Sequence, residues 1–116
     1  PALMRAQKVQ EKAAKAGFDW EDVFGALDKV YEESKELEDA IENDTNTEEE
    51  LGDLLFSAVN VARFIGADPE EALNKTTNKF VSRFSAVERM ATEEGKSLSD
   101  MTLAEMDKLW VKSKEI

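Results

Sequence analysis

Four acidic residues stand in two pairs whose spacing suits the binding of a metal ion. Glu33 and Glu36 are three residues apart, and Glu50 and Asp53 repeat that spacing further along the chain. Residues at i and i+3 project from neighbouring points of a helix, so each pair is able to grip one ion. A carboxylate beside apolar sequence is costly to bury unless a cation accompanies it. The two pairs therefore favour a site for a divalent cation.

The residue types that the chain lacks narrow the chemistry of that site. The sequence contains no Cys and no His. Thiolate and imidazole metal ligands are thereby excluded, and a site built of oxygen ligands favours Mg²⁺, Mn²⁺ or Ca²⁺. The same absence excludes disulfides and the Ser–His and Cys–His pairs of nucleophilic catalysis.

The charge balance limits the partners. Fifteen Lys and Arg against 26 Asp and Glu give a formal net charge of -11. Such a chain repels nucleic-acid phosphates over most of its surface, so we expect no nucleic-acid partner. No apolar run reaches the length of a membrane span and no signal peptide is present, so we expect no membrane partner and a cytoplasmic protein.

The apolar spacing predicts an all-α fold of four to five helices in one bundle. Asp19 is expected to cap the second helix, while Asp68 and Pro69 are typical of the start of the fourth. Thr102 and Glu105 have the spacing of a capping box. The length suits a single domain, residues 1–116, in which residues 1–17 form a leading helix or linker. The expected helices cover residues 2–16, 20–43, 48–65, 69–94 and 102–110.

The third expected helix, residues 48–65, is apolar nearly all round. Such a helix is buried at the centre of a bundle or at an oligomer interface, and in so small a domain we expect both. The short turn "DTNT" (44–47) should make the second and third helices antiparallel. The two acidic pairs would then converge in one pocket, and the domain would dimerise through its helices.

Three of the four acidic residues also have a purely structural interpretation. Glu50 has the spacing to close a capping box with Thr47, and Asp53 would compensate the helix dipole. Glu33 lies four residues after Lys29, as in an ordinary surface ion pair. Two pairs on consecutive helices, both at the flank of the apolar stripe, make metal binding and these structural roles comparable hypotheses.

Three further residue patterns bear on a ligand. Gly52 costs about 1 kcal/mol inside a helix, which indicates either a ligand near the backbone or a close helix crossing. Lys79 and Arg83 form a like-charge pair at i and i+4, which a phosphate between them would relieve, although surplus acids would also do so. Trp110 is either a core anchor beside Leu109 or a flat platform for a base.

The combined motifs resemble a known family. The segment "EESKE" followed by "ELGD" reads as E-x-x-E and then E-x-x-D, the metal signature of the all-α nucleoside triphosphate pyrophosphohydrolases. The segments "GFDW", "LGDLLFSAVNVARFIGADPEEAL", "NKFVSRF" and "EMDKLW" are similar to one branch of them, the MazG family. The resemblance covers essentially the whole chain.

The resemblance implies a Mg²⁺-dependent hydrolysis of nucleoside triphosphates to a monophosphate and pyrophosphate, with broad base specificity. It assigns the metal to Glu33, Glu36, Glu50 and Asp53. Glu36 and Glu49 are the two candidates for the general base. The implied substrate contacts are Lys29, Lys79 and Arg83 to phosphates, and Trp110, Asn46 and Glu49 to the nucleotide pocket.

The resemblance also bears on assembly and on the longer protein. It implies a homodimer or a dimer of dimers, and it suggests that the chain is the second, active copy of a tandem pair, with Pro1 as a cut end. Two alternatives stay open. One is a non-catalytic acidic helical module that dimerises and binds a basic partner. The other is a relative restricted to dUTP or dCTP, or a phosphoribosyl-ATP hydrolase.

Overall fold

The computed structural model describes residues 1–115, and every regular element within them is helical. This confirms the all-α class predicted from the sequence. The elements in chain order are α1 (Ala2–Lys15), α2 (Val23–Asn43), α3 (Thr47–Phe64), α4 (Pro69–Glu93), the 3₁₀ turn η1 (Leu98–Asp100) and α5 (Leu103–Ser113). None of these helices combines the length and the apolarity that a membrane crossing requires.

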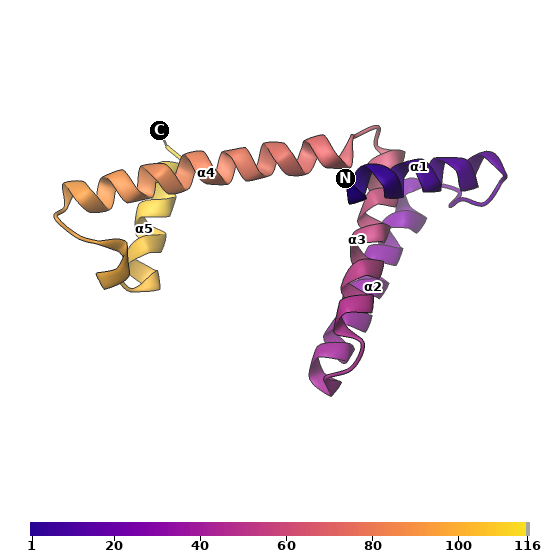
Figure 1. Cartoon of the computed structure of the whole chain (residues 1–116), viewed down its shortest axis with the longest axis horizontal. Helices are drawn as coiled ribbons and strands as arrows, with labels where there is room; N and C mark the ends of the chain where they lie inside the picture. Colours follow the sequence, from indigo (N-terminus) through magenta and orange to yellow (C-terminus); the bar gives the residue numbers. More distant parts are fainter. Residues whose placement is uncertain (116) are drawn as a thin grey trace. The chain divides into compact units, whose positions relative to one another are not determined.

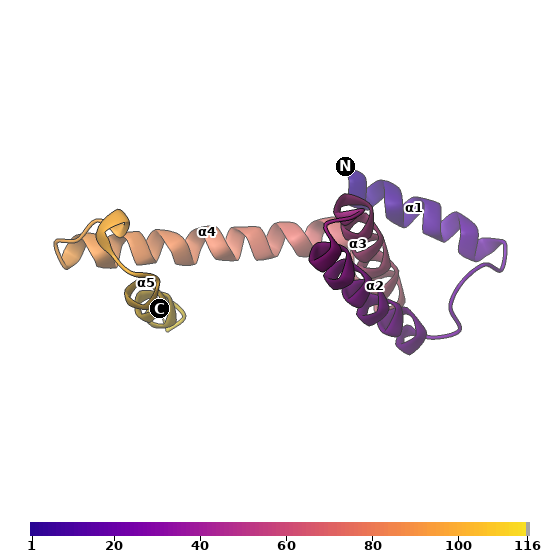
Figure 2. The same ribbon diagram turned by 90° about the horizontal axis from the view of Figure 1, so that it is seen from below.

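The helices are divided between two compact units. The first, Pro1–Ala72, contains α1, α2, α3 and the first turn of α4; the second begins at Leu73 and contains the rest of α4, η1 and α5. The elements of each unit can be followed in Figure 1 and, from below, in Figure 2. The packing of these two units into the expected single bundle stays a prediction, and so does dimerisation.

The first unit is an antiparallel pair of helices with a third packed on it. Helices α2 and α3 lie side by side, joined by a tight turn, and α1 packs against α3 (Figures 1 and 2). Asp44 and Asn46 in the turn have φ angles of 53° and 49°. Asp and Asn tolerate this left-handed conformation better than other non-glycine residues, so the "DTNT" segment allows an abrupt reversal.

The start of α2 differs from the sequence-based expectation. Asp22, and not Asp19, is the N-cap: its Oδ1 accepts hydrogen bonds from the backbone N–H of Phe24 at 2.9 Å and of Gly25 at 3.1 Å. Asp19 instead forms an ion pair with Arg63 on α3. A charged guanidinium is a stronger partner for a carboxylate than backbone amides, and local sequence does not reveal a partner so far along the chain.

The other expected caps are confirmed. Asp68 Oδ1 accepts hydrogen bonds from the N–H groups of Glu70 and Glu71 at the start of α4. At the start of α5, Thr102 and Glu105 form both hydrogen bonds of the capping box. These signals are local in sequence, which is why they were predictable.

Helix α3 is less buried in the single chain than its composition suggests. Leu51 and Leu55 are 46% and 50% exposed, whereas the buried residues of the helix are Ser57 and Val59. Within the first unit α3 packs against α2 and α1. Its burial at the centre of a bundle and its place at an oligomer interface, which were expected together, both stay predictions.

The second unit has a small core of its own. Val87, Ala91, Met101 and Leu109 are buried together, and the half-buried Trp110 packs against them. The ring of Trp110 also lies 5.4 Å from that of Phe80. Trp110 is thus a core anchor beside Leu109, one of the two roles that the sequence left open.

Candidate functional site

The antiparallel packing of α2 and α3 brings the two acidic pairs together. Carboxylate oxygens of Glu33, Glu50 and Asp53 all lie within 4.8 Å of one another, and Glu32, Glu33 and Glu36 form a second such group. Glu33 belongs to both groups, so all four residues singled out from the sequence belong to one cluster, which we call the acidic cluster. The convergence depends on helix packing across the α2–α3 turn.

Two oxygens of the acidic cluster are buried without a partner. Glu33 is 5% exposed; its Oε1 lies 2.7 Å from Lys29 Nζ, while its Oε2 has no hydrogen-bond partner among the described residues. Oε2 of Glu50 is likewise buried and has no hydrogen-bond partner among the described residues. The capping-box interpretation of Glu50 is wrong, because the N-cap of α3 is Asn46 and receives no side-chain hydrogen bond. Orphaned anionic oxygens are expensive, and a cation would satisfy them.

The proton affinities within the acidic cluster reflect this crowding. The hydrogen bond from Lys29 lowers the pKa of Glu33, although burial acts in the opposite direction. The hydrogen bond with Glu33, and then its negative charge, raise the pKa of Glu36, and the charge of Glu50 adds to the effect. Like charges held this close disfavour simultaneous ionisation. A divalent cation would remove that repulsion.

The ligand atoms available suit a hard cation. Every candidate in the acidic cluster is a carboxylate oxygen, and the neighbouring Lys29 balances only part of the negative charge. Mg²⁺ binds through a few carboxylates and keeps coordination positions for water and phosphate. The donor set therefore fits Mg²⁺, with Glu33, Glu36, Glu50 and Asp53 as the residues that would hold it.

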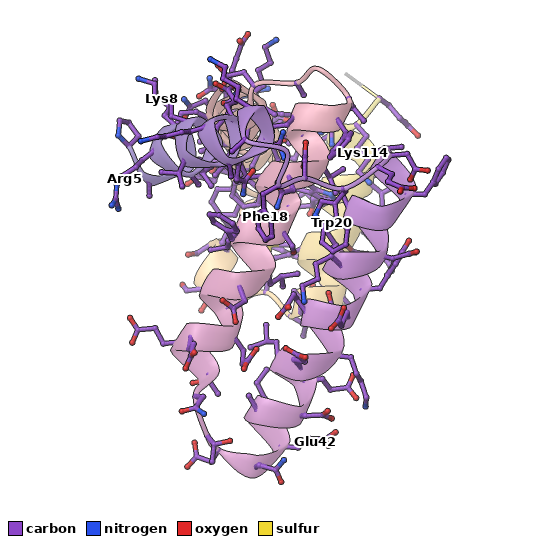
Figure 3. All side chains as sticks on the ribbon, turned by 90° about the vertical axis from the view of Figure 1, so that its right-hand side faces the viewer. Arg5, Lys8, Phe18, Trp20, Glu42 and Lys114 are labelled. Carbon is purple, nitrogen blue, oxygen red and sulfur yellow. The ribbon has the colours of Figure 1, made fainter. Side chains whose placement is uncertain are left out.

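A cavity of about 740 Å³ opens beside the acidic cluster, entirely within the first unit. Its walls come from α1, the loop before α2, α2 itself and α3 (Figure 3). Lys29, Glu33 and Asp53 form its charged part, and Phe18, Trp20 and Phe56 its aromatic part. The remaining lining residues are Val9, Gln10, Ala13, Gly17, Asp19, Ser57, Asn60 and Arg63.

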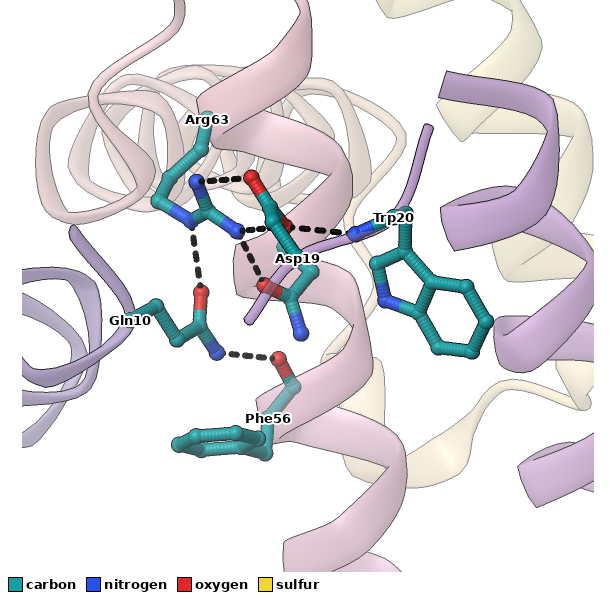
Figure 4. A network of polar contacts seen from close by, with 6 residues as sticks. Gln10, Asp19, Trp20, Phe56 and Arg63 are labelled. Carbon is teal, nitrogen blue, oxygen red and sulfur yellow. Dashed lines mark hydrogen bonds and ion pairs between the residues drawn. The ribbon is translucent and has the colours of Figure 1, made fainter. Parts of the chain in front are cut away.

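One wall of the cavity is held by a polar network around Arg63, shown in Figure 4. Arg63 Nη2 and Nη1 donate to Asp19 Oδ1 at 2.8 Å and Oδ2 at 3.2 Å. Its Nε donates to Gln10 Oε1 at 3.2 Å, and Nη2 also donates to Asn60 Oδ1 at 2.7 Å. Gln10 Nε2 in turn donates to the backbone oxygen of Phe56. The network ties α1 and the α1–α2 loop to α3.

The sequence did not lead us to the site residues in the wall around Arg63. Trp20 was quoted only within the "GFDW" motif, and Asn60 and Arg63 were not considered as site residues. A usable signal existed: Asp53, Phe56, Asn60 and Arg63 follow one another at the three- and four-residue steps of a single helix face. The importance of Asp19, in contrast, becomes visible only when its contact with Arg63 is known.

Several predicted site residues lie outside this cavity. Asn46 and Glu49 line a separate hollow at the start of α3 with Thr47 and Glu48. Lys79, Arg83 and Trp110 belong to the second unit, so their approach to the acidic cluster stays a prediction. Within that unit, the Arg83 guanidinium lies 6.0 Å from the centre of the Trp110 ring, a cation–π distance.

A family model described as the MazG nucleotide pyrophosphohydrolase domain matches residues 26–88, more than half of the 116 residues. The chain belongs to the MazG family. The matched MazG segment contains all four acids of the cluster together with Lys29, Lys79 and Arg83.

Individual MazG relatives extend the match over the whole chain. The chain is 46% identical to the nucleoside triphosphate pyrophosphohydrolase/pyrophosphatase MazG of Thermotoga maritima, over 98% of this chain and 44% of that protein. It is 44% identical to the nucleoside triphosphate pyrophosphohydrolase of Escherichia coli K12, over 100% of this chain and 46% of that protein. The uncharacterized protein YabN of Bacillus subtilis is 56% identical over 60% of this chain and 14% of its own length. The chain thus spans less than half of these relatives.

Proposed function

We propose that this chain hydrolyses nucleoside triphosphates to nucleoside monophosphates and pyrophosphate, with Mg²⁺ held in the acidic cluster. The observation that carries the proposal is the pair of buried, unpartnered oxygens, Glu33 Oε2 and Glu50 Oε2, beside a cavity large enough for a nucleotide. Membership of the MazG family and the names of the relatives from Thermotoga maritima and Escherichia coli support the same reaction.

The proposed reaction is the in-line attack of water on the α-phosphorus. A bond forms between the water oxygen and this phosphorus, the bond to the oxygen bridging to the β-phosphorus breaks, and pyrophosphate leaves. Bound Mg²⁺ supplies charge neutralisation for the phosphates and acidifies water. Lys29, which lines the cavity, would donate to phosphate oxygens.

Glu36 is the better supported of the two candidates for the general base. Its carboxylate belongs to the acidic cluster, beside the other residues that would hold the metal and its bound water. Glu49 lines the separate hollow at the start of α3. Lys79 and Arg83 are proposed to take up charge on the departing pyrophosphate, because a positioned cation stabilises the charge that develops there.

Assembly and substrate range belong to the same proposal. A homodimer or dimer of dimers would cover the exposed apolar side chains of α3, such as Leu51 and Leu55. Light scattering during gel filtration would test this directly, and a monomer at micromolar concentration would contradict it. We further propose a broad base specificity, Mn²⁺ as a substitute metal, and the cytoplasm, where nucleoside triphosphates and Mg²⁺ occur, as the location.

The decisive experiment measures pyrophosphate release from each nucleoside triphosphate, with Mg²⁺ and with a chelator. We expect release that requires Mg²⁺ and is abolished by Asp53→Asn. Glu42→Gln is the matched control, since it also removes one negative charge but lies in the exposed last turn of α2 (Figure 3). Absence of release from every triphosphate, or release that is indifferent to Mg²⁺, would favour the non-catalytic interaction module.

A further inference from the structure

Four positive charges lie on the outward side of α1, and no step of the proposed reaction uses them. Arg5, Lys8, Lys12 and Lys15 follow one another at three- and four-residue steps, which places them in one row along the helix. All four residues are exposed, and Figure 3 shows Arg5 and Lys8 extending outward from α1. We call these four residues the basic stripe.

The basic stripe stands opposite the side of α1 that packs on α3. Gln10, the buried residue of α1, is 4% exposed and donates a hydrogen bond to the backbone oxygen of Phe56 on α3. At about 3.6 residues per turn, Gln10 lies half a turn around the helix from the middle of the stripe. The packing of α1 on α3 therefore leaves the stripe uncovered in the first unit.

The charges of the basic stripe are not compensated. None of its residues forms an ion pair within the described part of the chain, although acidic residues outnumber basic ones by 26 to 15. Glu11 is the one acidic residue of α1, and it accepts a hydrogen bond from Gln7 instead of pairing with Lys8 or Lys15. Like charges at these helical steps repel one another. An anionic partner with matching spacing would relieve that repulsion.

The dimensions of the basic stripe suit a short helical partner. Arg5 and Lys15 are ten residues apart, which is roughly 15 Å along the helix axis. A helix with carboxylates at three- and four-residue steps presents its charges at the same intervals. Met4 and Val9 flank the stripe on its two sides and are 39% and 52% exposed, so such a partner would also cover apolar surface.

A nucleic acid fits this surface less well than a short acidic helix does. Because α1 contributes four basic residues and one acidic residue, the rest of the chain is more negative than the formal net charge of -11. A strand of phosphates that continued past the basic stripe would meet this negative surface and be repelled. An acidic protein segment can end where the stripe ends.

A membrane and a second copy of the chain are also less suitable partners. The inward side of α1 packs against α3, so α1 would have to leave α3 before inserting its apolar side into a lipid surface. A contact between the basic stripe of one copy and an acidic surface of another joins two different surfaces. Such heterologous contacts form open assemblies unless their rotation closes a ring. A helix of a different protein has neither restriction.

We propose that the basic stripe of α1 is a docking surface for an acidic helical segment of another protein. The carboxylates of that segment would pair with the four cations, while its backbone side covers Met4 and Val9. Docking there goes beyond the proposed reaction, since no residue of the stripe lines the cavity or belongs to the acidic cluster.

The test measures the binding of a synthetic helical peptide to the full chain by fluorescence anisotropy, at low ionic strength where screening is weak. The peptide carries four Glu at three- and four-residue steps, and a second peptide carries Gln at the same positions. We expect the Glu peptide to bind and the Gln peptide not to bind. Replacing all four residues of the basic stripe by Gln should weaken binding of the Glu peptide roughly 10-fold or more.

The matched control replaces one Arg and three Lys of the second unit by Gln, namely Arg89, Lys108, Lys112 and Lys114. This control has the same net charge as the stripe variant, and it should bind the Glu peptide like the wild type. Thermal unfolding verifies that both variants are folded, and the stripe variant should melt at an unchanged or higher temperature, since repulsion along α1 is removed.

Equal weakening in the stripe variant and the control would overturn the proposal, as would a Glu peptide that does not bind the wild type. Single-stranded DNA or phosphatidylserine vesicles that bind through the basic stripe more tightly than the Glu peptide would also overturn it, and would assign the stripe to a nucleic acid or a membrane. Self-association of the wild type that the stripe variant loses, without peptide binding, would assign the stripe to a second copy instead.

Discussion

Lys29 Nζ lies 2.7 Å from Glu33 Oε1, one helical turn further along α2, while Glu33 Oε2 is buried without a partner among the described residues. The lysine therefore satisfies one half of a buried carboxylate and leaves the other half to a ligand. Without the lysine, the apo protein would carry an uncompensated buried charge. The pair thus stabilises the fold, and under the proposed function a cation would satisfy the second oxygen.

Lys29→Met should lower the free energy of unfolding by roughly 1–3 kcal/mol without Mg²⁺, because it leaves Glu33 unpaired. Adding Glu33→Gln should recover most of the loss, since the double variant has no unpaired charge. Chemical denaturation of the four proteins of this cycle measures the effect. Additive losses in the double variant would show that the two side chains do not interact.

Glu36→Gln should reduce turnover about 100-fold or more, because it removes both a metal ligand and the proposed base. The melting temperature of the metal-free variant should be unchanged or higher, since a carboxylate that repels Glu33 is lost. The rise in melting temperature on adding Mg²⁺ should become smaller than in Glu42→Gln. A large fall in stability of the metal-free variant would instead assign Glu36 a structural role.

Arg83→Gln and Lys79→Gln should each lower kcat for triphosphates by about 10- to 1,000-fold if these side chains stabilise the leaving pyrophosphate. Arg89→Gln removes the same charge from an exposed position further along α4 and is the matched control. Steady-state kinetics with saturating Mg²⁺ distinguishes the three variants. Equal activity in all three variants would show that Lys79 and Arg83 take no part in the reaction.

Gly52→Ala tests why glycine stands between Glu50 and Asp53. An added Cβ would meet nothing within 4 Å in the first unit, so no close helix crossing occurs at Gly52 within that unit. Alanine should stabilise the helix by about 1 kcal/mol. If a substrate or a second copy approaches the backbone there, turnover or dimerisation should decrease while the melting temperature rises. Unchanged turnover and assembly would exclude both.

Asp19→Asn tests the stabilising contribution of the Arg63 network by pH. The hydrogen bond from Arg63 lowers the pKa of Asp19 below its ordinary value of 3.8. A carboxyl group with a lowered folded-state pKa stabilises the protein above its unfolded-state pKa, and this contribution disappears as the pH falls through the folded-state pKa. The variant should be less stable by about 1 kcal/mol at neutral pH.

The difference in unfolding free energy between wild type and Asp19→Asn should therefore decrease below pH 3.8. Denaturant titrations at a series of pH values measure it. Asp28→Asn, at an exposed position of α2 in the same unit, is the matched control. A constant difference down to the acid transition would show that the ion pair does not stabilise the unit.

Local patterns accounted for most of the fold. The periodicity of apolar residues predicted the helices, and the caps at Asp68 and at Thr102 with Glu105 followed from neighbouring residues alone. The cap of α2 was wrongly assigned to Asp19 because the sequence offers two aspartates there, and only the distant Arg63 decides between them. The exposure of Leu51 and Leu55 was missed for a similar reason: composition shows that a side chain is apolar, not what covers it.

The ligand chemistry of the acidic cluster follows from residue types and spacing alone. With neither Cys nor His available, the spacing of Glu33, Glu36, Glu50 and Asp53 allowed only oxygen ligands at helical intervals. In contrast, the cavity that joins this cluster to Trp20, Asn60 and Arg63 became visible only in the folded chain. Ligand type is a property of single residues, whereas a cavity exists only where α1, α2 and α3 pack around a shared space.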